Sequence, residues 1–127
     1  LSRYGCHCVV CAPPTGSTAY AYSAGGPVVW PQVEALLLVP ISAHALFSRA
    51  LVTAPTSTIS ITVDPFTTSA LLCCDGRRVS TLPPGTRVTV RRGVLPVRVV
   101  RVRPSTFTER LVAKFELPVE GWRGTIG

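Results

Sequence analysis

Proline and glycine divide this sequence into short apolar runs. The longest of them, residues 35–41, itself contains Pro40. Between the breaks the chain often alternates with the two-residue period of a strand, as in residues 57–63, where Ile59, Ile61 and Val63 fall on one face. Many short strands separated by Gly and Pro turns are typical of sandwiches and barrels. We therefore expect a mainly β, sandwich-like fold with one or two short helices.

The breaks also define the expected elements. Strands are predicted at residues 8–12, 35–39, 50–53, 57–63, 69–74, 77–82, 86–91 and 95–103. Asp75-Gly76, between two of these strands, is a strong hairpin signal. Residues 18–24 are compact and Ala-rich, which predicts a short helix capped by Ser17 or Thr18 and ended by the following Gly-Gly-Pro. Residues 107–115 are expected to form a final helix or strand.

Charge in this chain is sparse and mostly positive. Only 15% of the residues are charged, against about a quarter in an average soluble domain. The net charge is +7, from 13 Lys and Arg against 6 Asp and Glu. Nearly all the cations are Arg, whose planar fork pairs with phosphate, so nucleotides and nucleic acids are both conceivable partners. The low charge density predicts apolar surface that a partner or another domain normally covers.

The chain of 127 residues has the size of one domain, and we interpret residues 1–127 as a single domain. Its longest apolar run is too short to span a bilayer, so no membrane segment is expected. The sequence shows no basic region followed by an apolar stretch, the pattern of a signal peptide. These features, together with the cysteine usage described next, favour a cytoplasmic location.

Five cysteines are present, which is an odd number. They are Cys6, Cys8, Cys11, Cys73 and Cys74. Adjacent cysteines do not readily bridge each other, so reduced thiols are expected. Cys6, Cys8 and Cys11 superficially resemble a metal site, but on a strand Cys11 points away from the other two, and no second Cys/His pair has the usual spacing. We therefore expect no metal site and interpret the cysteines as small buried hydrophobes.

The stretch from Pro14 to Pro27 is the most informative part of the sequence. It reads as a strand end, a tight Gly turn and the start of a helix, an arrangement that presents unpaired backbone N–H groups. The hydroxyls of Thr15, Ser17, Thr18 and Ser23 add short donors and acceptors, and Tyr20 adds a flat face for a ring. These groups suit a dinucleotide, although the spacing alone equally fits a capped helix after a turn.

This stretch resembles the long signature of the NAD kinase family, Pro-Thr-Gly-Ser-Thr-Ala-Tyr closed by Ser-Ala-Gly-Gly-Pro. The resemblance continues through residues 38–52, with Leu-Val-Pro-Ile followed by His-Ala-Leu and Arg-Ala-Leu-Val. Asp75-Gly76 matches the Asp-Gly hairpin of the family, and residues 107–115 and 121–124 look like those of actinobacterial members. The resemblance thus covers essentially the whole chain, which is similar to the C-terminal, NAD-binding domain of these enzymes.

The resemblance implies a fold and an activity. NAD kinases transfer the γ-phosphate of ATP, or polyphosphate in some members, to the 2′-hydroxyl of the NAD adenosine ribose and thereby make NADP. Their N-terminal α/β domain carries a Gly-Gly-Asp-Gly motif that supplies the base and helps to place a divalent metal ion such as Mg²⁺. Their C-terminal domain is a β-sandwich that supplies much of the NAD site. The enzymes are homo-oligomers in which a neighbouring subunit completes the site.

The resemblance also implies roles for individual residues. Thr15 would lie near the adenine, and Thr18 and Tyr20 would line the adenine and ribose region. Ala19 and Ser23 would meet the nicotinamide end of an NAD held mainly by a neighbouring subunit. The implied cofactor-binding set is completed by Ala21 and Tyr22 within the same run, by His7 and by Arg77.

The sequence departs from the family pattern in four respects. His7 stands where the family has an NAD-contacting Asp, and Pro13 replaces a residue that is usually Thr. Arg77 stands where many members have Gln. The Gly-Gly-Asp-Gly motif is absent from these 127 residues, so no catalytic residue is expected in them. His44 matches a recurring family His, which we interpret as structural or interfacial.

Three functional hypotheses remain open. In the first, the chain is the NAD-binding and oligomerising part of an NAD kinase. In the second, it is a non-catalytic remnant or a dinucleotide-binding interaction module, a reading that the changes at His7 and Pro13 favour. In the third and weakest, it is a basic nucleic-acid-binding β-domain. Such domains interleave aromatic residues with cations, but the Arg-rich residues 87–103 contain no aromatic side chain.

Overall fold

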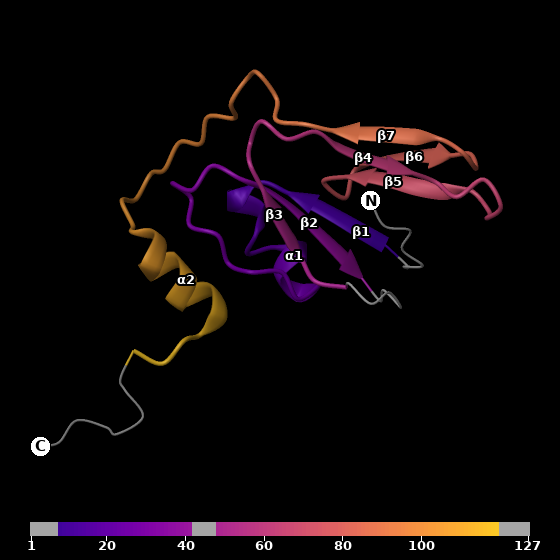
Figure 1. The fold of residues 1–127 in the computed structure, drawn as a ribbon. Coiled ribbons are helices and arrows are strands. Elements are labelled where there is room, and N and C mark those ends of the chain that lie inside the picture. Colours follow the sequence, from indigo (N-terminus) through magenta and orange to yellow (C-terminus); the bar gives the residue numbers. More distant parts are fainter. Residues whose placement is uncertain (1–7, 42–47, 120–127) are drawn as a thin grey trace, which may run out of the picture.

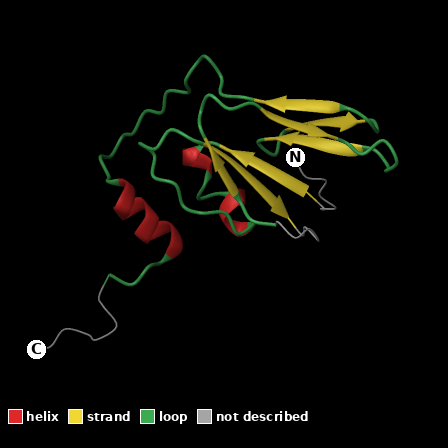
Figure 2. Ribbon diagram, viewed as in Figure 1, coloured by secondary structure: helices red, strands yellow, loops and turns green. Residues whose placement is uncertain are grey.

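Short antiparallel strands make up most of the regular structure, as the computed structural model of residues 8–41 and 48–119 shows (Figures 1 and 2). The elements in chain order are β1 (Cys8–Ala12), η1 (Pro14–Gly16, a 3₁₀ turn), α1 (Tyr20–Ser23), β2 (Leu36–Ile41), β3 (Leu51–Thr53), β4 (Ile59–Thr62), β5 (Ala70–Cys74), β6 (Arg78–Leu82), β7 (Arg87–Val90) and α2 (Phe107–Phe115). The expected mainly β class with two helices is confirmed. In the part of the chain that the structure describes, no helix is long and apolar enough to cross a membrane.

The first sheet has three antiparallel strands in the order β1-β2-β3. β2 lies in the middle, and its alternating Leu37 and Val39 are fully buried. Pro40 pairs with Val9 of β1, but β3 pairs only with the first half of β2, from Leu36 to Leu38. The proline therefore lies beyond the part of β2 that has a strand on both sides, where a missing N–H is tolerated.

The core lies between this sheet and the segment that joins β1 to β2. Its buried residues are Ala12, Ala21, Val29, Leu37 and Val39, with Val10, Ala24 and Ala50 packed at its edge. Two of the five buried members come from the connecting segment, one from α1 and one from the stretch after it. The connection is therefore held against the sheet by its own side chains, which fixes the part of the chain that carries the candidate site.

The second half of the chain contains two two-stranded sheets, β4–β7 and β5–β6. In Figure 1 both lie at one end of the molecule, beside the three-stranded sheet. Residues 75–77 join β5 to β6, and the first two of them, Asp75 and Gly76, have φ angles of 53° and 67°. Two consecutive residues with positive φ are typical of the tight hairpin that Asp-Gly predicts. The expected hairpin is thus confirmed, and Asp75 acts in it as a turn former.

α2 begins with a capping box and packs on the connection between β1 and β2. The N–H of Thr106 donates to the Glu109 carboxylate at 2.7 Å, and the N–H of Glu109 donates to the Thr106 hydroxyl at 3.2 Å. This reciprocal pair selects the helix from the two possibilities left open for residues 107–115. Aromatic contacts from α2 reach the region of α1, which Figure 1 shows beside it.

The strand expected at residues 95–103 is absent, so that prediction is wrong. Residues 91–106 run from β7 to α2 without regular structure and are exposed throughout. Val94 and Val102 keep 95% and 94% of their surface accessible. The alternation of Val and Arg is suited to a strand, but a strand also needs a neighbour, and among the described residues these valines have none.

Two smaller expectations are corrected as well. The helix expected at residues 18–24 is only the four-residue α1, and its N-cap is Ala19, which makes no side-chain bond. Ser17 does not cap it, because its hydroxyl is bonded to Val29 instead. The cysteines that the structure describes are free thiols, but Cys8 and Cys73 are exposed, and Cys11 and Cys74 are half-buried. The interpretation as buried hydrophobes is therefore wrong for these four, since each lies on a strand with an open face.

Candidate functional site

A tight turn follows β1 and begins the candidate site. The N–H of Gly16 donates to the Pro13 carbonyl at 2.9 Å, and the N–H of Ala19 donates to the Gly16 carbonyl at 3.1 Å. A Cβ atom on Gly16 would lie 3.2 Å from the ring of Pro13 and 3.3 Å from the Cβ of Ala12. A larger side chain would therefore crowd Ala12 and Pro13 at this position. The two hydrogen-bonded turns bring Thr15 and Thr18 onto one open surface.

Ser17 anchors this turn to a distant part of the chain. Its side chain is completely buried. The N–H of Val29 donates to Ser17 Oγ at 2.9 Å, and Ser17 Oγ donates to the Val29 carbonyl at 3.3 Å. A buried hydroxyl that both accepts and donates is fully satisfied and holds its partners in register. Ser17 is thus a structural member of the signature, unavailable to a ligand.

Gly26 anchors the other end of the signature. Its N–H donates to the Ala21 carbonyl at 2.8 Å, and a Cβ atom here would lie only 2.7 Å from that oxygen. Ala21 itself is 1% exposed and belongs to the core. The Ala21 side chain is therefore not exposed where it could make the contact with a dinucleotide that the resemblance implies. Glycine is the only residue that fits position 26 without displacing the backbone of α1.

The remaining signature side chains lie at the surface. Thr15, Ala19, Tyr20 and Ser23 are exposed, with 61% of Tyr20 accessible, and Thr18 is half-buried. Tyr22 is also partly exposed, but its ring lies 4.4 Å from the ring of Phe115 in α2. The structure therefore brings most of the expected site residues together on one segment and separates them cleanly from the buried anchors.

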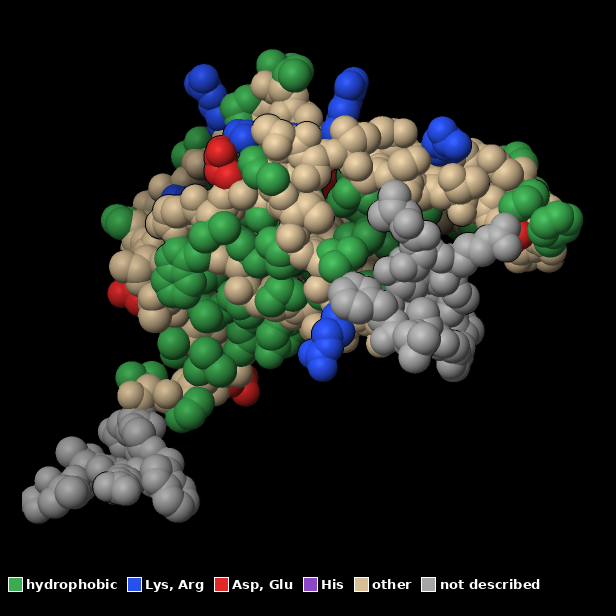
Figure 3. Space-filling model, viewed as in Figure 1, with side chains coloured by type: hydrophobic (Ala, Val, Ile, Leu, Met, Phe, Trp, Pro, Cys, Tyr) green, Lys and Arg blue, Asp and Glu red, His purple; other side chains and the backbone are tan. Residues whose placement is uncertain are grey.

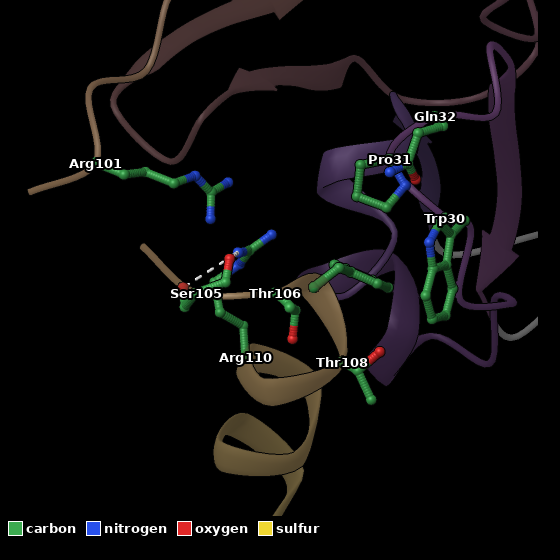
Figure 4. Close-up of a pocket in the computed structure, with 9 residues that line it drawn as sticks. Trp30, Pro31, Gln32, Arg101, Ser105, Thr106, Thr108 and Arg110 are labelled. Carbon is green, nitrogen blue, oxygen red and sulfur yellow. Dashed lines mark hydrogen bonds between the residues drawn. The ribbon is translucent and has the colours of Figure 1, made fainter. Parts of the chain in front are cut away.

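A groove lies between the signature turn and α2. It has a volume of about 220 Å³ and is bounded by Thr15 and Thr18 on one side and by Arg110, Leu111 and Lys114 of α2 on the other. A larger, open depression of about 490 Å³ adjoins it and shares Pro31, Arg101, Phe107 and Arg110 (Figure 4). We call the two together the α2 groove. Hydroxyls on one wall and cations on the other make it suitable for an anionic, hydrogen-bonding ligand.

Apolar side chains surround this region. Figure 3 shows them gathered on the face that carries α1 and α2, while most Lys and Arg side chains in that view lie along the upper outline. Tyr20, Trp30 and Val33 are among the exposed large hydrophobic residues of this part of the chain. Exposed apolar area of this kind marks binding or docking surfaces, as the low charge density of the sequence predicted.

Among the described residues of the implied binding set, Thr15 and Thr18 line the α2 groove, whereas Arg77 lies away from it. Arg77 is exposed in the β5–β6 hairpin, where its N–H donates to the Cys74 carbonyl at 3.2 Å, and it lines neither part of the α2 groove. The neighbouring Arg78 forms an exposed ion pair with Asp75 at 3.7 Å, an interaction of little energetic weight. His7 lies outside the described residues, as does His44.

Titratable chemistry in the described residues is limited. Burial, and to a lesser degree the nearby Cys8, raises the pKa of the Cys11 thiol above its usual value. A raised pKa keeps this sulfur protonated and unreactive at neutral pH. Residues 8–41 and 48–119 contain no group of three or more His, Cys, Asp or Glu side chains placed to hold a metal ion. The described residues therefore do not fit a divalent metal ion.

Sequence reasoning missed the contribution of α2 and of Trp30. The ring of Trp30 meets the ring of Phe107 edge-on, with centroids 4.6 Å apart. Arg110 places its guanidinium 5.8 Å from the centre of the same Phe107 ring. The signal in the sequence was the Thr106-x-x-Glu109 capping box, which fixes a helix and thereby places Phe107 and Arg110 on neighbouring turns.

Comparison with known proteins decides the family. Residues 1–102 match the model of the ATP-NAD kinase C-terminal domain, which is well over half of the chain. This chain belongs to that family. The match includes the signature turn and the seven strands of the described residues, whereas α2 and the residues after it lie beyond the matched range.

Curated relatives extend the similarity of this family member to α2. The chain is 64% identical to NAD kinase 2 of Streptomyces avermitilis and 62% identical to the NAD kinase of Thermobifida fusca, each over 124 residues and 98% of its length. These matches cover 41% and 38% of the two relatives. The chain thus spans about two fifths of the length of the curated relatives that it matches.

Solved structures of NAD kinases share the fold. Yeast NADH kinase complexed with NADH superimposes with a TM-score of 0.69 and 37% identity, over 74% of this chain and 27% of that one. An NAD kinase from Archaeoglobus fulgidus in complex with ATP gives a TM-score of 0.66 and 29% identity, over 76% of this chain and 36% of that one. The mainly β fold expected from the sequence is therefore shared with solved members of this family.

Proposed function

We propose that this chain is the NAD-binding part of an NAD kinase. The complete enzyme would transfer the γ-phosphate of ATP, or of polyphosphate, to the 2′-hydroxyl of the NAD adenosine ribose and so produce NADP. The observation that carries the proposal is the division of the signature into buried anchors and exposed polar groups. Ser17 and Gly26 hold the turn, while Thr15, Thr18 and Tyr20 remain free for a ligand.

Each exposed residue has a role in this proposal. Thr15 would face the adenine, and Thr18 and Tyr20 would line the adenine and ribose, because a hydroxyl can bond a ring nitrogen or a sugar oxygen and a phenol ring can pack on a base. Ala19 and Ser23 would contact the nicotinamide end of an NAD held mainly by a neighbouring subunit. Solved relatives whose complexes contain NADH and ATP support NAD and ATP as the substrates.

The chemical step is assigned to another part of the enzyme. Removing the proton from a ribose hydroxyl needs a positioned base, and phosphoryl transfer needs bound metal ions. The 127 residues contain no Gly-Gly-Asp-Gly run. We propose that an N-terminal α/β domain supplies both, that residues 1–127 form one domain beside it, and that the enzyme is a cytoplasmic homo-oligomer. The length of the curated relatives supports the additional domain.

Calorimetric titration of the chain with NAD, and then with NADP, tests the proposal. The chain should bind NAD saturably, and Tyr20→Ala should weaken binding about tenfold, since base stacking on an aromatic ring is worth roughly 1–3 kcal/mol. Phe66→Ala is the matched control, because Phe66 is 92% exposed in a loop between β4 and β5. It removes a ring of similar size and should leave NAD affinity unchanged.

This titration, together with a titration with an oligonucleotide and an assay of NADP formation, separates the proposal from its alternatives. A folded chain that binds neither NAD nor NADP would support the reading as a non-catalytic remnant. Oligonucleotide binding that weakens steeply with salt and ignores NAD would support the nucleic-acid reading. NADP formation from ATP and NAD by these 127 residues alone would contradict the assignment of the chemistry to another domain.

A further inference from the structure

The segment between β7 and α2 carries the residue pattern of a strand. Val and Arg alternate from residue 97 to residue 103, with one interruption at the doubled Val99-Val100. Alternation with a period of two places the two residue types on opposite faces of an extended chain. A β-bulge at the doubled valine would keep that phase, because a bulge inserts one extra residue into a strand. We call the first face the valine face, which consists of Val97, Val99, Val100 and Val102, and the second the arginine face, which consists of Arg98, Arg101 and Arg103.

The valine face is open in this domain. Its four members each keep at least 72% of their surface accessible. Arg101 of the other face lines the α2 groove, into which Figure 4 shows its side chain extending, whereas none of the four valines lines it. Among the described residues, none exchanges a backbone hydrogen bond with residues 97–103. The segment therefore presents both an apolar stripe and a row of unpaired backbone groups, which together suit pairing with a strand.

The length of the relatives indicates what covers the valine face. The matches to the Streptomyces avermitilis and Thermobifida fusca enzymes run over 98% of this chain and so include residues 97–103. About three fifths of each relative lies outside the match. Because the matching family model is a C-terminal domain, that remaining length belongs mainly before it. The segment thus occurs in enzymes that have a further domain to cover it.

A second copy of this chain is a poorer occupant on grounds of charge. Two copies of the segment that share one apolar face must also place their arginine faces together on the other side of the sheet. Like charges on neighbouring strands destabilise the pairing. The whole chain carries a net charge of +7, which adds to the repulsion between copies. A different domain can cover the valines without bringing a second set of arginines.

We propose that residues 97–103 form a strand that adds to a sheet edge of the N-terminal domain and buries the valine face there. The proposal rests on the function proposed above, because it requires that domain. The backbone N–H and C=O groups of the segment would pair with the edge strand, and the valines would pack on the core beneath it. This contact accounts for both the strand pattern of the segment and the absence of a strand in the isolated domain.

Hydrogen exchange measured by mass spectrometry tests the docking. The 127-residue chain is compared with a full-length chain in which it replaces the matched part of NAD kinase 2 of Streptomyces avermitilis, which is 64% identical to it. The amides of residues 97–103 should exchange at the unprotected rate in the short chain and about a hundredfold more slowly in the full-length chain. The amides of the paired strands β4 and β7 should exchange alike in both chains and serve as the internal reference.

A pair of valine variants shows whether the valine face makes the contact. Val102→Asp should restore fast exchange of residues 97–103 in the full-length chain, because it places a carboxylate on the buried face. Val94→Asp is the matched control, since Val94 is an equally exposed valine of the same segment but lies outside the alternating residues 97–103. It should leave the protection unchanged. Both variants should leave the urea midpoint of the 127-residue chain unchanged, because both side chains are exposed in it.

The outcomes separate the docking from the proposed function. Equally fast exchange in the two chains, or equal effects of Val94→Asp and Val102→Asp, would overturn the docking. Protection in the 127-residue chain that rises with protein concentration would assign the segment to a second copy and would overturn it as well. NADP formation by the full-length chain is measured in parallel. A chain that protects the segment but makes no NADP would support the docking and contradict the function, and an active chain with an unprotected segment would do the reverse.

Discussion

Ser17 and Val29 exchange two hydrogen bonds across twelve residues of chain, with the Val29 N–H bonded to Ser17 Oγ at 2.9 Å. This exchange joins the turn after β1 to the segment that leads into β2. Because both residues are buried, no water is at hand to replace either bond. The shape of the signature turn therefore depends on one hydroxyl that no ligand touches.

Ser17→Ala should lower the free energy of unfolding by about 1–3 kcal/mol, since it leaves the N–H and the carbonyl of Val29 buried without a partner. Urea denaturation measures this change, and calorimetry should show NAD binding weakened in parallel. Ser60→Ala is the control, because Ser60 is exposed on β4. An unaltered unfolding midpoint in Ser17→Ala would contradict the anchoring role.

Gly26→Ala should destabilise the chain by roughly 1–3 kcal/mol through overpacking. The added Cβ would lie 2.7 Å from the Ala21 carbonyl oxygen and 3.0 Å from the Val39 side chain, so the backbone of α1 must move. Gly93→Ala is the matched control, because its Cβ would have no neighbour closer than 3.9 Å. The melting temperatures of the two variants should differ by several degrees. Equal melting temperatures would show that the backbone of α1 shifts to accommodate the added Cβ without loss of stability.

Phe115→Ala should loosen α2 from the signature, because the Tyr22 and Phe115 rings lie 4.4 Å apart. A double-mutant cycle with Tyr22→Ala should give a coupling of about 0.5–1.5 kcal/mol. Denaturant unfolding of the four chains measures it, with Phe66→Ala combined with Tyr22→Ala as the uncoupled control. Strictly additive effects for the Tyr22 and Phe115 pair would mean that the rings do not support each other.

Cys11 should react with iodoacetamide more slowly than the exposed Cys73 at pH 8. Its pKa is raised by burial, and only the thiolate attacks, so less reactive sulfur is present at a given pH. The difference should narrow as the pH rises toward the raised value. Mass spectrometry of timed digests measures both rates. In urea the two thiols should become equally reactive, and equal rates in the native chain would contradict the burial of Cys11.

The strands were largely predictable from the sequence, because hairpins and alternation are local signals. Asp75-Gly76 specifies its own turn, and the alternation of Ile59 and Ile61 specifies which face of β4 is covered. The strand expected at residues 95–103 failed for the opposite reason. A β-rich segment forms a strand only beside an edge, and no pattern within residues 95–103 reveals whether an edge is present.

The location of the candidate site was predictable from the sequence. Which of its residues are buried anchors and which are exposed to a ligand was not. The signature run locates the turn, yet the local pattern predicts a helix cap at Ser17, because capping is the usual local role of serine. Its actual partner, Val29, is twelve residues away and carries no sequence signal. Likewise, the place of Arg110 in the α2 groove depends on how α2 packs, which is set by contacts between aromatic rings and not by the spacing of cations.

The nesting of the two smaller sheets has a consequence for the order in which the chain folds. β4 and β7 pair across the whole of β5 and β6, so the inner hairpin lies within the loop that the outer pair must close. A hairpin with a three-residue connection such as residues 75–77 closes within about 1–10 μs and shortens the loop that remains. Folding of this half should therefore start at Asp75-Gly76 and proceed outward, and a change in that turn would slow the pairing of strands that never touch it.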